Sequence, residues 1–380
     1  MDGSRRAVAR VNLAAIGRNV ARLAREAEPA ALCAVVKADG YGHGMVPCAR
    51  AAMGAGASWL AVATAHEAAG LRAGGLDAVP ILVLGALTDA ELGVALEAAA
   101  DITVWTLEHV AALRAAGRPA RVHVKLDTGM GRLGTRDPEE ATAVVEAVAA
   151  AESLELVGAW THFATADDRG DAFFGRQLAA FRAWAEPLRA RHPGLLLHAA
   201  NSAALLRDVA SHFDLVRPGV AIYGLDPLGE DPAARDLEPA LELASVVAAV
   251  KPVAPGESVG YGRRWRAQRD TLVATVPIGY GDGYRRGLSN CGEALLHGVR
   301  IPLVGTVSMD NVTFDVGAAG LGPQVGDDVV LIGAQGAERI TAEDLARLLD
   351  TINYEVTCAI TARVPRIYHR DGGPADARAR

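Results

Sequence analysis

The sequence predicts an α/β protein, a (β/α)8 barrel of the TIM type followed by a C-terminal β-rich domain. From about residue 30 to residue 224, about eight short apolar runs alternate with amphipathic helical segments. That number of strand–helix units in roughly 190 residues is typical of a compact parallel barrel. Beyond about residue 230, the apolar runs are separated by glycine and proline turns, with no long helices between them.

Eight apolar runs are the expected barrel strands. They are CAVVK (33–37), WLAVA (59–63), ILVLG (81–85), ITVW (102–105), VHVKL (122–126), LVGAW (156–160), LLLHA (195–199) and LVRPG (215–219). Helical segments such as DAELGVALEAAA and PEEATAVVEAVAAA separate them. A doubly wound open sheet would alternate in the same way, but it usually has fewer units and a glycine-rich first turn. No GxGxxG follows the first run, so the pattern favours the barrel.

The second domain begins after a change of composition near residue 225. The segment DPLGEDPAARDLEP is rich in proline, aspartate and glycine, and we interpret it as a linker. The strand-like runs LELASVVAAVKPV, TLVATVPIGY, GVRIPLVGTV, NVTFDV and DDVVLIG follow it. We therefore assign residues 12–230 to the barrel and residues 231–380 to the β domain, which the strand-like opening residues 1–11 are expected to join. One helix is predicted near the end, with Thr341 as its N-cap and Asp344 at its third position.

Composition and charge exclude several classes of partner. The chain has 380 residues and a formal net charge of −7, which argues against nucleic acid or an anionic membrane as partner and favours a small molecule. The cysteines form no CxxC pair and the histidines do not cluster, so we expect neither a disulfide framework nor a metal site. Arginines interrupt the N-terminus where a signal peptide needs an apolar core, and no apolar run is long enough to span a membrane. We therefore expect a cytoplasmic protein.

The first predicted strand ends in a lysine that a glycine-rich turn follows, VVKADGYGHG, with Lys37 at its start. In a parallel barrel, functional residues project from the carboxyl ends of the strands. Burial at an apolar barrel mouth lowers the pKa of a lysine and frees its amine to react with an aldehyde cofactor. A lysine at a strand end more often extends to solvent. The glycines favour the functional interpretation, because they let the backbone pass close to a bound group.

The segment KADGYGHG resembles the cofactor-lysine signature of the alanine racemase family, and the resemblance extends along the whole chain. It implies pyridoxal 5'-phosphate (PLP) as cofactor, a homodimer with shared active sites, and interconversion of L-alanine and D-alanine that supplies peptidoglycan synthesis. It also implies two catalytic bases, Lys37 and the Tyr261 of the opposite subunit, which lies in SVGYGRRW. A tyrosine with its ordinary pKa of about 10 is a poor base, so we expect His162 and Arg217 to stabilise its phenolate.

The same resemblance implies a set of cofactor contacts. The implied cofactor-binding residues are Lys37, Tyr41, Asn201, Ser202, Arg217, Gly219, Val220 and Tyr354. Asn201 and Ser202 open a predicted helix, where N–H groups and a hydroxyl bind anions, although both residue types are also ordinary helix caps. Arg217 is implied to lie beside the pyridine nitrogen. A guanidinium donates a hydrogen bond there without protonating the ring, which weakens the electron sink and favours prompt reprotonation over transamination.

The resemblance also implies residues that contact the substrate. The implied substrate-binding residues are Arg132 and, from the opposite subunit, Tyr280, Met309 and Asp310. Arg132, in VKLDTGMGRLG, would bind the substrate carboxylate with its planar fork and also contact the phenolic oxygen of the cofactor. Lys125, in the same segment, stands at a position that some family members carbamylate, and the resulting anion would steady Arg132. His162, in THFATAD, is implied to link Arg217 with the second base.

Three alternative functions share parts of this pattern. A barrel-type amino-acid decarboxylase shares the two-domain plan, but it would place a carboxylate rather than Arg217 at the pyridine nitrogen. A non-catalytic PLP carrier resembles the barrel alone, so the β domain with Tyr261 argues against it. A serine or broad-specificity racemase of the same fold stays open, because the size of its substrate pocket depends on packing around Tyr280, Met309 and Tyr354.

Overall fold

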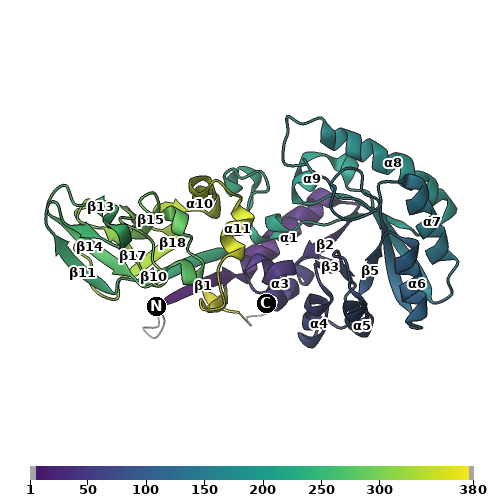
Figure 1. Cartoon of the computed structure of the whole chain (residues 1–380), viewed down its shortest axis with the longest axis horizontal. Helices are drawn as coiled ribbons and strands as arrows, with labels where there is room; N and C mark the ends of the chain where they lie inside the picture. The colour runs from purple at the N-terminus through teal and green to yellow at the C-terminus, as the bar shows by residue number, and fades with distance from the viewer. Residues whose placement is uncertain (1–5, 376–380) are drawn as a thin grey trace. The chain divides into compact units, whose positions relative to one another are not determined.

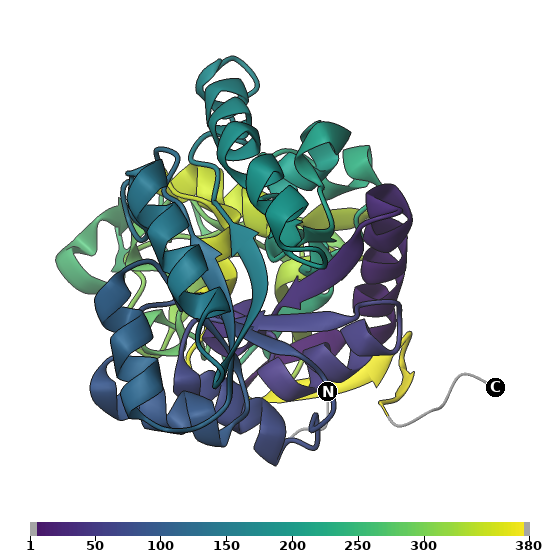
Figure 2. The same cartoon turned by 90° about the vertical axis from the view of Figure 1, so that its right-hand side faces the viewer.

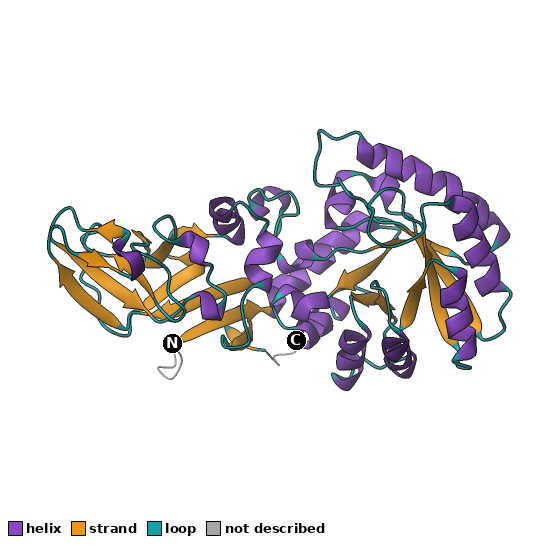
Figure 3. Ribbon diagram, in the orientation of Figure 1, coloured by secondary structure: helices purple, strands orange, loops and turns teal. Residues whose placement is uncertain are grey.

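The computed structural model describes residues 6–375, which form two compact units. The barrel unit comprises Ile16–Gly40 and Met45–Ile222, and the β unit comprises Tyr41–Gly44 together with the described residues up to Ala15 and from Tyr223 onward. Figure 3 shows that helices and strands alternate in the barrel unit, whereas strands predominate in the β unit. None of the helices between residues 6 and 375 combines the length and the apolarity that crossing a membrane requires.

Eight parallel strands form the wall of the barrel unit (Figures 1 and 2). They are β2 (Ala31–Val35), β3 (Trp59–Val62), β4 (Ile81–Val83), β5 (Asp101–Val104), β6 (Ala120–Lys125), β7 (Leu154–Trp160), β8 (Leu196–His198) and β9 (Leu215–Val216). Adjacent strands pair in parallel, and their order in the sheet is β8-β7-β6-β5-β4-β3-β2-β9. The Asp214 N–H donates to the Leu197 carbonyl (3.0 Å) and the Arg217 N–H to the Ala200 carbonyl (2.8 Å), which joins the two end strands. The predicted barrel is confirmed, and every strand overlaps one of the eight predicted runs.

Helices enclose the barrel strands, as Figure 2 shows. They are α1 (Leu13–Ala27), α3 (Met45–Met53), α4 (Ala65–Ala73), α5 (Asp89–Glu97), α6 (Leu107–Ala115), α7 (Pro138–Ala149), α8 (Phe173–Arg191) and α9 (Ser202–Arg207). Threonine side chains cap α4, α5 and α6, and a glutamate at the third helical position completes a capping box in α4 and α5. The short element α2 (Lys37–Tyr41) joins β2 to α3 and turns in the left-handed sense.

The β unit contains an eight-stranded sheet and a three-stranded sheet. The larger sheet comprises β1 (Ala7–Asn12), β10 (Leu241–Val246), β15 (Glu293–Leu296), β16 (Val299–Pro302), β18 (Asp328–Gln335), β19 (Glu338–Ile340), β20 (Arg366–Arg370) and β21 (Gly373–Pro374). The smaller sheet comprises β11 (Ala249–Val253), β14 (Thr271–Val276) and β17 (Val312–Asp315), and β12 (Ser258–Val259) forms a hairpin with β13 (Trp265–Arg266). The opening strand β1 lies between β10, to which it is antiparallel, and β20, to which it is parallel. The domain boundaries at 12–230 and 231–380 remain predictions.

Near the C-terminal end of the β unit lie the α-helices α10 (Ala342–Leu349) and α11 (Asn353–Cys358). The predicted start of α10 is confirmed. The Asp344 N–H donates to Thr341 Oγ1 (3.1 Å), and the Thr341 N–H donates to Asp344 Oδ2 (2.8 Å). The two residues therefore form a reciprocal capping box that satisfies N–H groups the helix leaves without partners.

The segment of residues 226–239, which the sequence predicts to be a linker, is folded. Asp226 is fully buried, and its Oδ2 accepts hydrogen bonds from Arg235 Nη1 (2.6 Å) and from the Glu230 N–H (2.9 Å). The short 3-10 helix η3 (Pro232–Arg235) brings Arg235 back onto Asp226. Proline and glycine set the turns of this segment, but a buried ion pair holds it in place.

Candidate active site

The predicted site residues of the barrel unit all stand at the carboxyl ends of strands. Lys37 follows β2, Lys125 is the last residue of β6, His162 follows β7, Ser202 follows β8 and Arg217 follows β9. Because the strands are parallel, these ends lie on the same rim of the barrel, where barrel proteins hold their functional groups. The predicted residues Asn201, Gly219 and Val220 come from the loops after β8 and β9 on the same rim.

Arg217 is buried at this rim, with 3% of its surface exposed. Its Nη1 donates to His198 Nδ1 (2.8 Å), and its Nη2 donates to the carbonyls of Thr161 (2.9 Å) and Ala199 (3.1 Å). Within residues 6–375, no hydrogen-bond partner is found for its Nε. Burial lowers the pKa of Arg217 to about 10, so the guanidinium remains a cation at neutral pH. Arg217 is therefore a fixed cation whose Nε–H is available to a ligand.

A chain of buried hydrogen bonds runs from Arg217 through the barrel interior. His198 Nε2 contacts His123 Nδ1 (2.9 Å), and His123 Nε2 contacts Asp101 Oδ2 (3.1 Å). A guanidinium only donates and a carboxylate only accepts, so each histidine must be neutral, with its proton on Nε2. Burial, and next the charge of Arg217, hold the pKa of His198 well below its usual value. We call these four residues the histidine chain, and they fix the orientation of Arg217.

Trp160 lies against the charged groups at the end of β7 and is 2% exposed. Lys125 Nζ lies 4.3 Å from the centroid of its ring, and the guanidinium carbon of Arg217 lies 4.7 Å from it. The His198 ring stacks on the same side chain with an interplanar angle of 9°. Cation–π attraction to the indole partly offsets the cost of holding two cations in a buried place.

The rim of the barrel is strongly cationic. Burial and the charges of Arg217 and Arg132 lower the pKa of Lys125 to about 7. Burial and the charges of Arg217, Lys125, Arg132 and Lys37 hold the pKa of His162 well below its usual value. Two like charges about 4 Å apart repel by about 4 kcal/mol at an effective dielectric constant of about 20, so such a cluster favours an anionic ligand.

The sequence predicts that His162, together with Arg217, stabilises the phenolate of Tyr261. The depressed pKa of His162 makes the imidazole neutral at physiological pH, because its surroundings are buried and already hold several cations. Its Nδ1 lies 3.5 Å from Arg217 Nη2, so it stands next to Arg217 as expected. The positive charge at this point of the rim therefore comes from Arg217.

Two loops shape the remaining part of the rim. The Asp127 carboxylate accepts hydrogen bonds from the N–H groups of Gly129 (3.0 Å) and Gly131 (2.9 Å), which bends the loop that carries Arg132. After β8 and β9, Ser202 Oγ accepts a hydrogen bond from the Gly219 N–H (2.9 Å), so these two predicted cofactor contacts are adjacent. Asn201 serves as the N-cap of α9, where its Oδ1 accepts from the Ala204 N–H (2.9 Å).

The predicted partner-facing residues of the β unit gather on three loops that are bonded to one another. The Tyr280 N–H donates to the Ser308 carbonyl (3.0 Å), and the Gly281 N–H donates to the Met309 carbonyl (2.9 Å). Thr306 Oγ1 donates to the Tyr261 carbonyl (2.8 Å). We call Tyr261, Tyr280, Met309 and Asp310 the Tyr261 surface.

The side chains of the Tyr261 surface are unusually exposed. Tyr261 is 74% exposed, Met309 51% and Tyr280 42%. Asp310 Oδ1 accepts a hydrogen bond from Arg363 Nη2 (2.7 Å), which anchors the loop. Large apolar side chains exposed together indicate an interaction site.

Tyr41 and Tyr354 form a separate group in the β unit. Their ring centroids lie 6.0 Å apart, and the Tyr41 ring also lies 5.1 Å from that of Tyr223. Tyr41 is 7% exposed. Gly42 follows it with a φ of +83°, and a side chain there would lie 2.2 Å from the Thr357 carbonyl oxygen. Only glycine allows the backbone to pass this close to α11.

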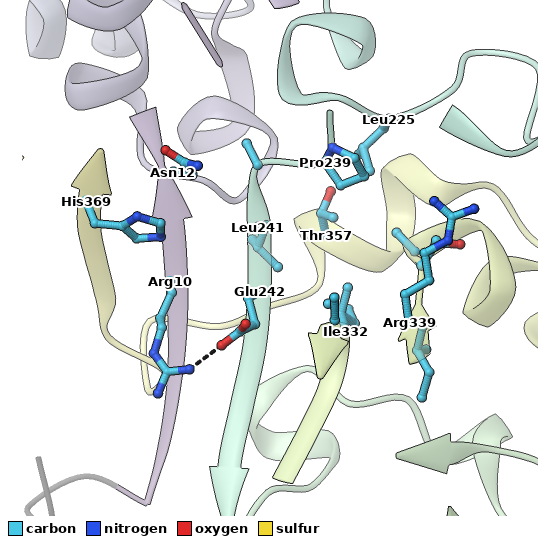
Figure 4. Close-up of a pocket in the computed structure, with 16 residues that line it drawn as sticks. Arg10, Asn12, Leu225, Pro239, Leu241, Glu242, Ile332, Arg339, Thr357 and His369 are labelled. Carbon is cyan, nitrogen blue, oxygen red and sulfur yellow. Dashed lines mark hydrogen bonds and ion pairs between the residues drawn. The ribbon is translucent and has the colours of Figure 1, made fainter. Parts of the chain in front are cut away.

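A cavity of about 270 Å³ in the β unit offers a different environment (Figure 4). Arg10 from β1 and Glu242 from β10 form an ion pair at its wall, and Arg339 pairs with Asp231. These charged groups are thus neutralised by one another. The cavity lacks the unbalanced charge that marks the barrel rim, so the rim is the stronger candidate site.

Comparison with known proteins decides the family. The family model of the alanine racemase N-terminal domain matches residues 11–227, and that of the C-terminal domain matches residues 240–368. The chain belongs to the alanine racemase family. The alanine racemase of Symbiobacterium thermophilum is 43% identical over 373 residues, which cover 97% of this chain and 98% of that protein.

Solved alanine racemase structures agree in fold. The alanine racemase from Streptomyces coelicolor A3(2) superposes with a TM-score of 0.90 at 41% identity, over 97% of this chain and 99% of that one. The alanine racemase from Bartonella henselae, described with covalently bound pyridoxal phosphate, gives a TM-score of 0.85 at 30% identity, over 96% of this chain and all of that one (100%).

Within this alanine racemase fold, sequence reasoning missed the residues that orient the site. His123, His198, Trp160 and Asp101 were not predicted. One signal was available, because His123 stands two residues before Lys125 and must share its face of the strand. A histidine inside an otherwise apolar parallel strand needs a buried partner. That partner comes from another strand, so the sequence alone does not identify it.

Proposed function

We propose that this chain is a PLP-dependent alanine racemase, an isomerase that interconverts L-alanine and D-alanine. The observation that carries the proposal is Arg217, a buried cation that the histidine chain holds and whose Nε has no partner among residues 6–375, on a rim that also bears Lys37, Lys125 and Arg132. A pyridine nitrogen is an acceptor that matches this Nε, and a guanidinium there distinguishes the site from one with a carboxylate.

The donor set of the rim fits PLP. The phosphate and the phenolic oxygen of the cofactor are anionic, and both would be compensated by the charges of Lys37, Arg132 and Arg217. Ser202 would hold the phosphate together with backbone N–H groups of Gly219 and Val220, and Asn201, Tyr41 and Tyr354 would complete its surroundings. When bound, PLP withdraws electrons from the substrate carbon and makes its hydrogen acidic.

Lys37 and Tyr261 would act as the two bases. Racemisation removes a proton from one face of the substrate carbon and returns a proton on the other, so two groups fixed on opposite faces suffice. The Lys37 amine would serve the hydrogen of D-alanine, and the Tyr261 phenol would serve that of L-alanine. With His162 neutral, Arg217 would be the cation that favours the phenolate.

The shared site requires a homodimer. Tyr261 is 74% exposed on its own chain, and the phenol of a catalytic base must be shielded from bulk water to act on one carbon. We propose that the Tyr261 surface covers the barrel rim of a second copy, where Tyr280, Met309 and Asp310 would contact the substrate. Arg132 would bind the substrate carboxylate. The cytoplasm and the supply of D-alanine for peptidoglycan are the proposed setting.

Lys125 would carry a carbamate. Its pKa of about 7 leaves a large fraction of neutral amine at physiological pH. The nitrogen lone pair attacks the carbon of CO2, the amine loses one proton to solvent, and an anionic carbamate forms. That anion would replace one positive charge beside Arg132 by a negative one and so steady the arginine.

Chiral analysis of products tests the activity. We expect the purified protein to convert L-alanine to a mixture of enantiomers. A comparable rate on L-serine would favour the alternative, a serine or broad-specificity racemase. Consumption of L-lysine with release of CO2 would instead indicate a decarboxylase. Lys37→Ala should lose both cofactor absorbance and turnover, and retention of both in that variant would contradict the proposal.

A further inference from the structure

The backbone directly after Lys37 is held in an unfavourable conformation. Ala38, Asp39 and Gly40 have φ values of 52°, 50° and 63°, all in the left-handed region. For residues other than glycine, this conformation is unfavourable, because it brings Cβ too close to the following carbonyl oxygen. Such a turn persists only where surrounding groups hold it in place, and strained segments of this kind cluster at functional sites.

One carboxylate, that of Glu67, ties this turn to the next strand of the barrel. Glu67 Oε1 accepts a hydrogen bond from the Ala38 N–H (2.6 Å). Its Oε2 accepts from the N–H groups of Ala63 (2.8 Å) and Thr64 (3.1 Å), at the end of β3. Hydrogen bonds from N–H groups to an ionised carboxylate are stronger than those between neutral groups. The residue after Lys37 is thereby fixed to the neighbouring strand end.

The next helix repeats the local motif without this contact. Glu67 belongs to the capping box of α4 with Thr64, and Glu91 belongs to the capping box of α5 with Thr88. The hydrogen bonds found for the Glu91 carboxylate within residues 6–375 go to Thr88 alone. Helix capping therefore accounts for both glutamates, but it does not account for the bond from Ala38 to Glu67.

We propose that Glu67 is a positioning residue that aims Lys37 by fixing the left-handed turn behind it. The inference rests on the proposed role of Lys37 as the cofactor lysine. A glutamine at position 67 has one acceptor oxygen instead of two and presents an NH2 group to an N–H donor. The N–H groups of Ala63 and Thr64 both need the one remaining oxygen, so the Ala38 N–H loses its acceptor and the turn loosens. Lys37 keeps its chemistry but samples more directions.

Two matched variants test this inference, Glu67→Gln and Glu91→Gln. The first readout is hydrogen–deuterium exchange of the full-length protein without cofactor, followed at the Ala38 amide. The loss of one hydrogen bond corresponds to roughly tenfold faster exchange, which we expect in Glu67→Gln and not in Glu91→Gln. Unchanged exchange in Glu67→Gln, or equal acceleration in both variants, would overturn the inference.

The second readout follows Lys37 itself. The chain has three lysines, Lys37, Lys125 and Lys251, so borohydride reduction with PLP followed by peptide mass spectrometry identifies the labelled one. We expect labelling of Lys37 to slow several-fold in Glu67→Gln, and kcat to fall while KM for alanine stays nearly constant. A KM effect with unchanged kcat and labelling would also overturn the inference.

The two proposals fail in different ways. Labelling of Lys125 or Lys251 in the unaltered protein would contradict the proposed function, whereas the exchange measurement at Ala38 needs no cofactor. If Glu67→Gln does not fold, Glu67→Asp replaces it, because it keeps two acceptor oxygens but shortens the reach by one methylene. The same faster exchange at Ala38 is expected there, and unchanged exchange would count against the inference.

Discussion

At the scale of single residues, the histidine chain determines how Arg217 meets a ligand. Asp101 and Arg217 lie at its two ends, and His123 and His198 connect them. Because Arg217 only donates and Asp101 only accepts, each histidine carries its proton on Nε2. All four side chains are buried, so a missing member leaves polar groups without partners in a place that water does not reach. The chain thus couples the stability of the barrel interior to the orientation of one functional arginine.

The first prediction concerns His123. In His123→Leu, the Asp101 carboxylate and the His198 Nε2–H both lose a partner, and we expect the free energy of unfolding to fall by about 2–4 kcal/mol. Urea unfolding measures this loss. His192→Leu is the control, because His192 pairs with Glu146 near the surface and its loss should cost below about 1 kcal/mol. Equal small losses in the two variants would contradict the structural role of the chain.

A second prediction concerns the pH dependence of Lys125. Its pKa is lowered to about 7, so the amine is mostly protonated below that pH and mostly neutral above it. Only the neutral amine reacts with CO2, so carbamate occupancy should rise as pH increases through about 7 at constant dissolved CO2. Carbon-13 NMR with labelled bicarbonate measures the occupancy. The exposed Lys251 is the internal comparison, and an occupancy of Lys125 that is flat or falls with pH would contradict the prediction.

At the scale of elements, the strands were predictable and several loops were not. A parallel barrel strand is covered on both faces, so it appears in the sequence as a short apolar run, and all eight were found in this way. The caps of α10 were predictable because Thr341 and Asp344 interact locally. The left-handed turn after Lys37 was not, because the Ala38 N–H donates to Glu67, which belongs to a different strand–helix unit.

The same distinction applies to residues 226–239. Proline and glycine there indicate turns, but whether the turns are packed depends on Arg235 reaching a buried Asp226. The sequence motifs predict that the site residues lie on the rim of the barrel. The charge state of His162, in contrast, depends on charged residues that other strands contribute. Sequence patterns report local structure well, and they report the electrostatic result of assembly poorly.

The prediction at this scale is that Arg235 stabilises the segment. Arg235→Ala leaves the Asp226 carboxylate buried without its cation, and we expect a loss of about 3–5 kcal/mol in the free energy of unfolding. Arg300→Ala is the matched control, because Arg300 also pairs with two carboxylates but is more exposed, and its loss should cost below about 1 kcal/mol. Thermal or urea unfolding compares the two. A loss in Arg235→Ala no larger than that of the control would contradict the buried role.

At the scale of the whole molecule, the proposal is that each site is built from two copies of the chain. Two inactive variants then complement each other, because a heterodimer of Lys37→Ala and Tyr261→Ala contains one site with both bases intact. Random pairing makes half of the dimers mixed, each with one working site of two, so co-expression should restore about a quarter of the unaltered activity. If mixed dimers form but show no racemase activity, this result would contradict the proposal that each active site is built from two chains.

The claim on which the account depends most is that Lys37 and Tyr261 serve opposite faces of the substrate. The direct measurement is NMR-monitored exchange of the α-hydrogen of each alanine enantiomer in deuterated water with Tyr261→Ala. We predict that this variant still exchanges the hydrogen of D-alanine through Lys37, while exchange of L-alanine and racemisation both fall by about a hundredfold or more. Exchange that is lost equally, or retained equally, for both enantiomers would contradict the two-base account.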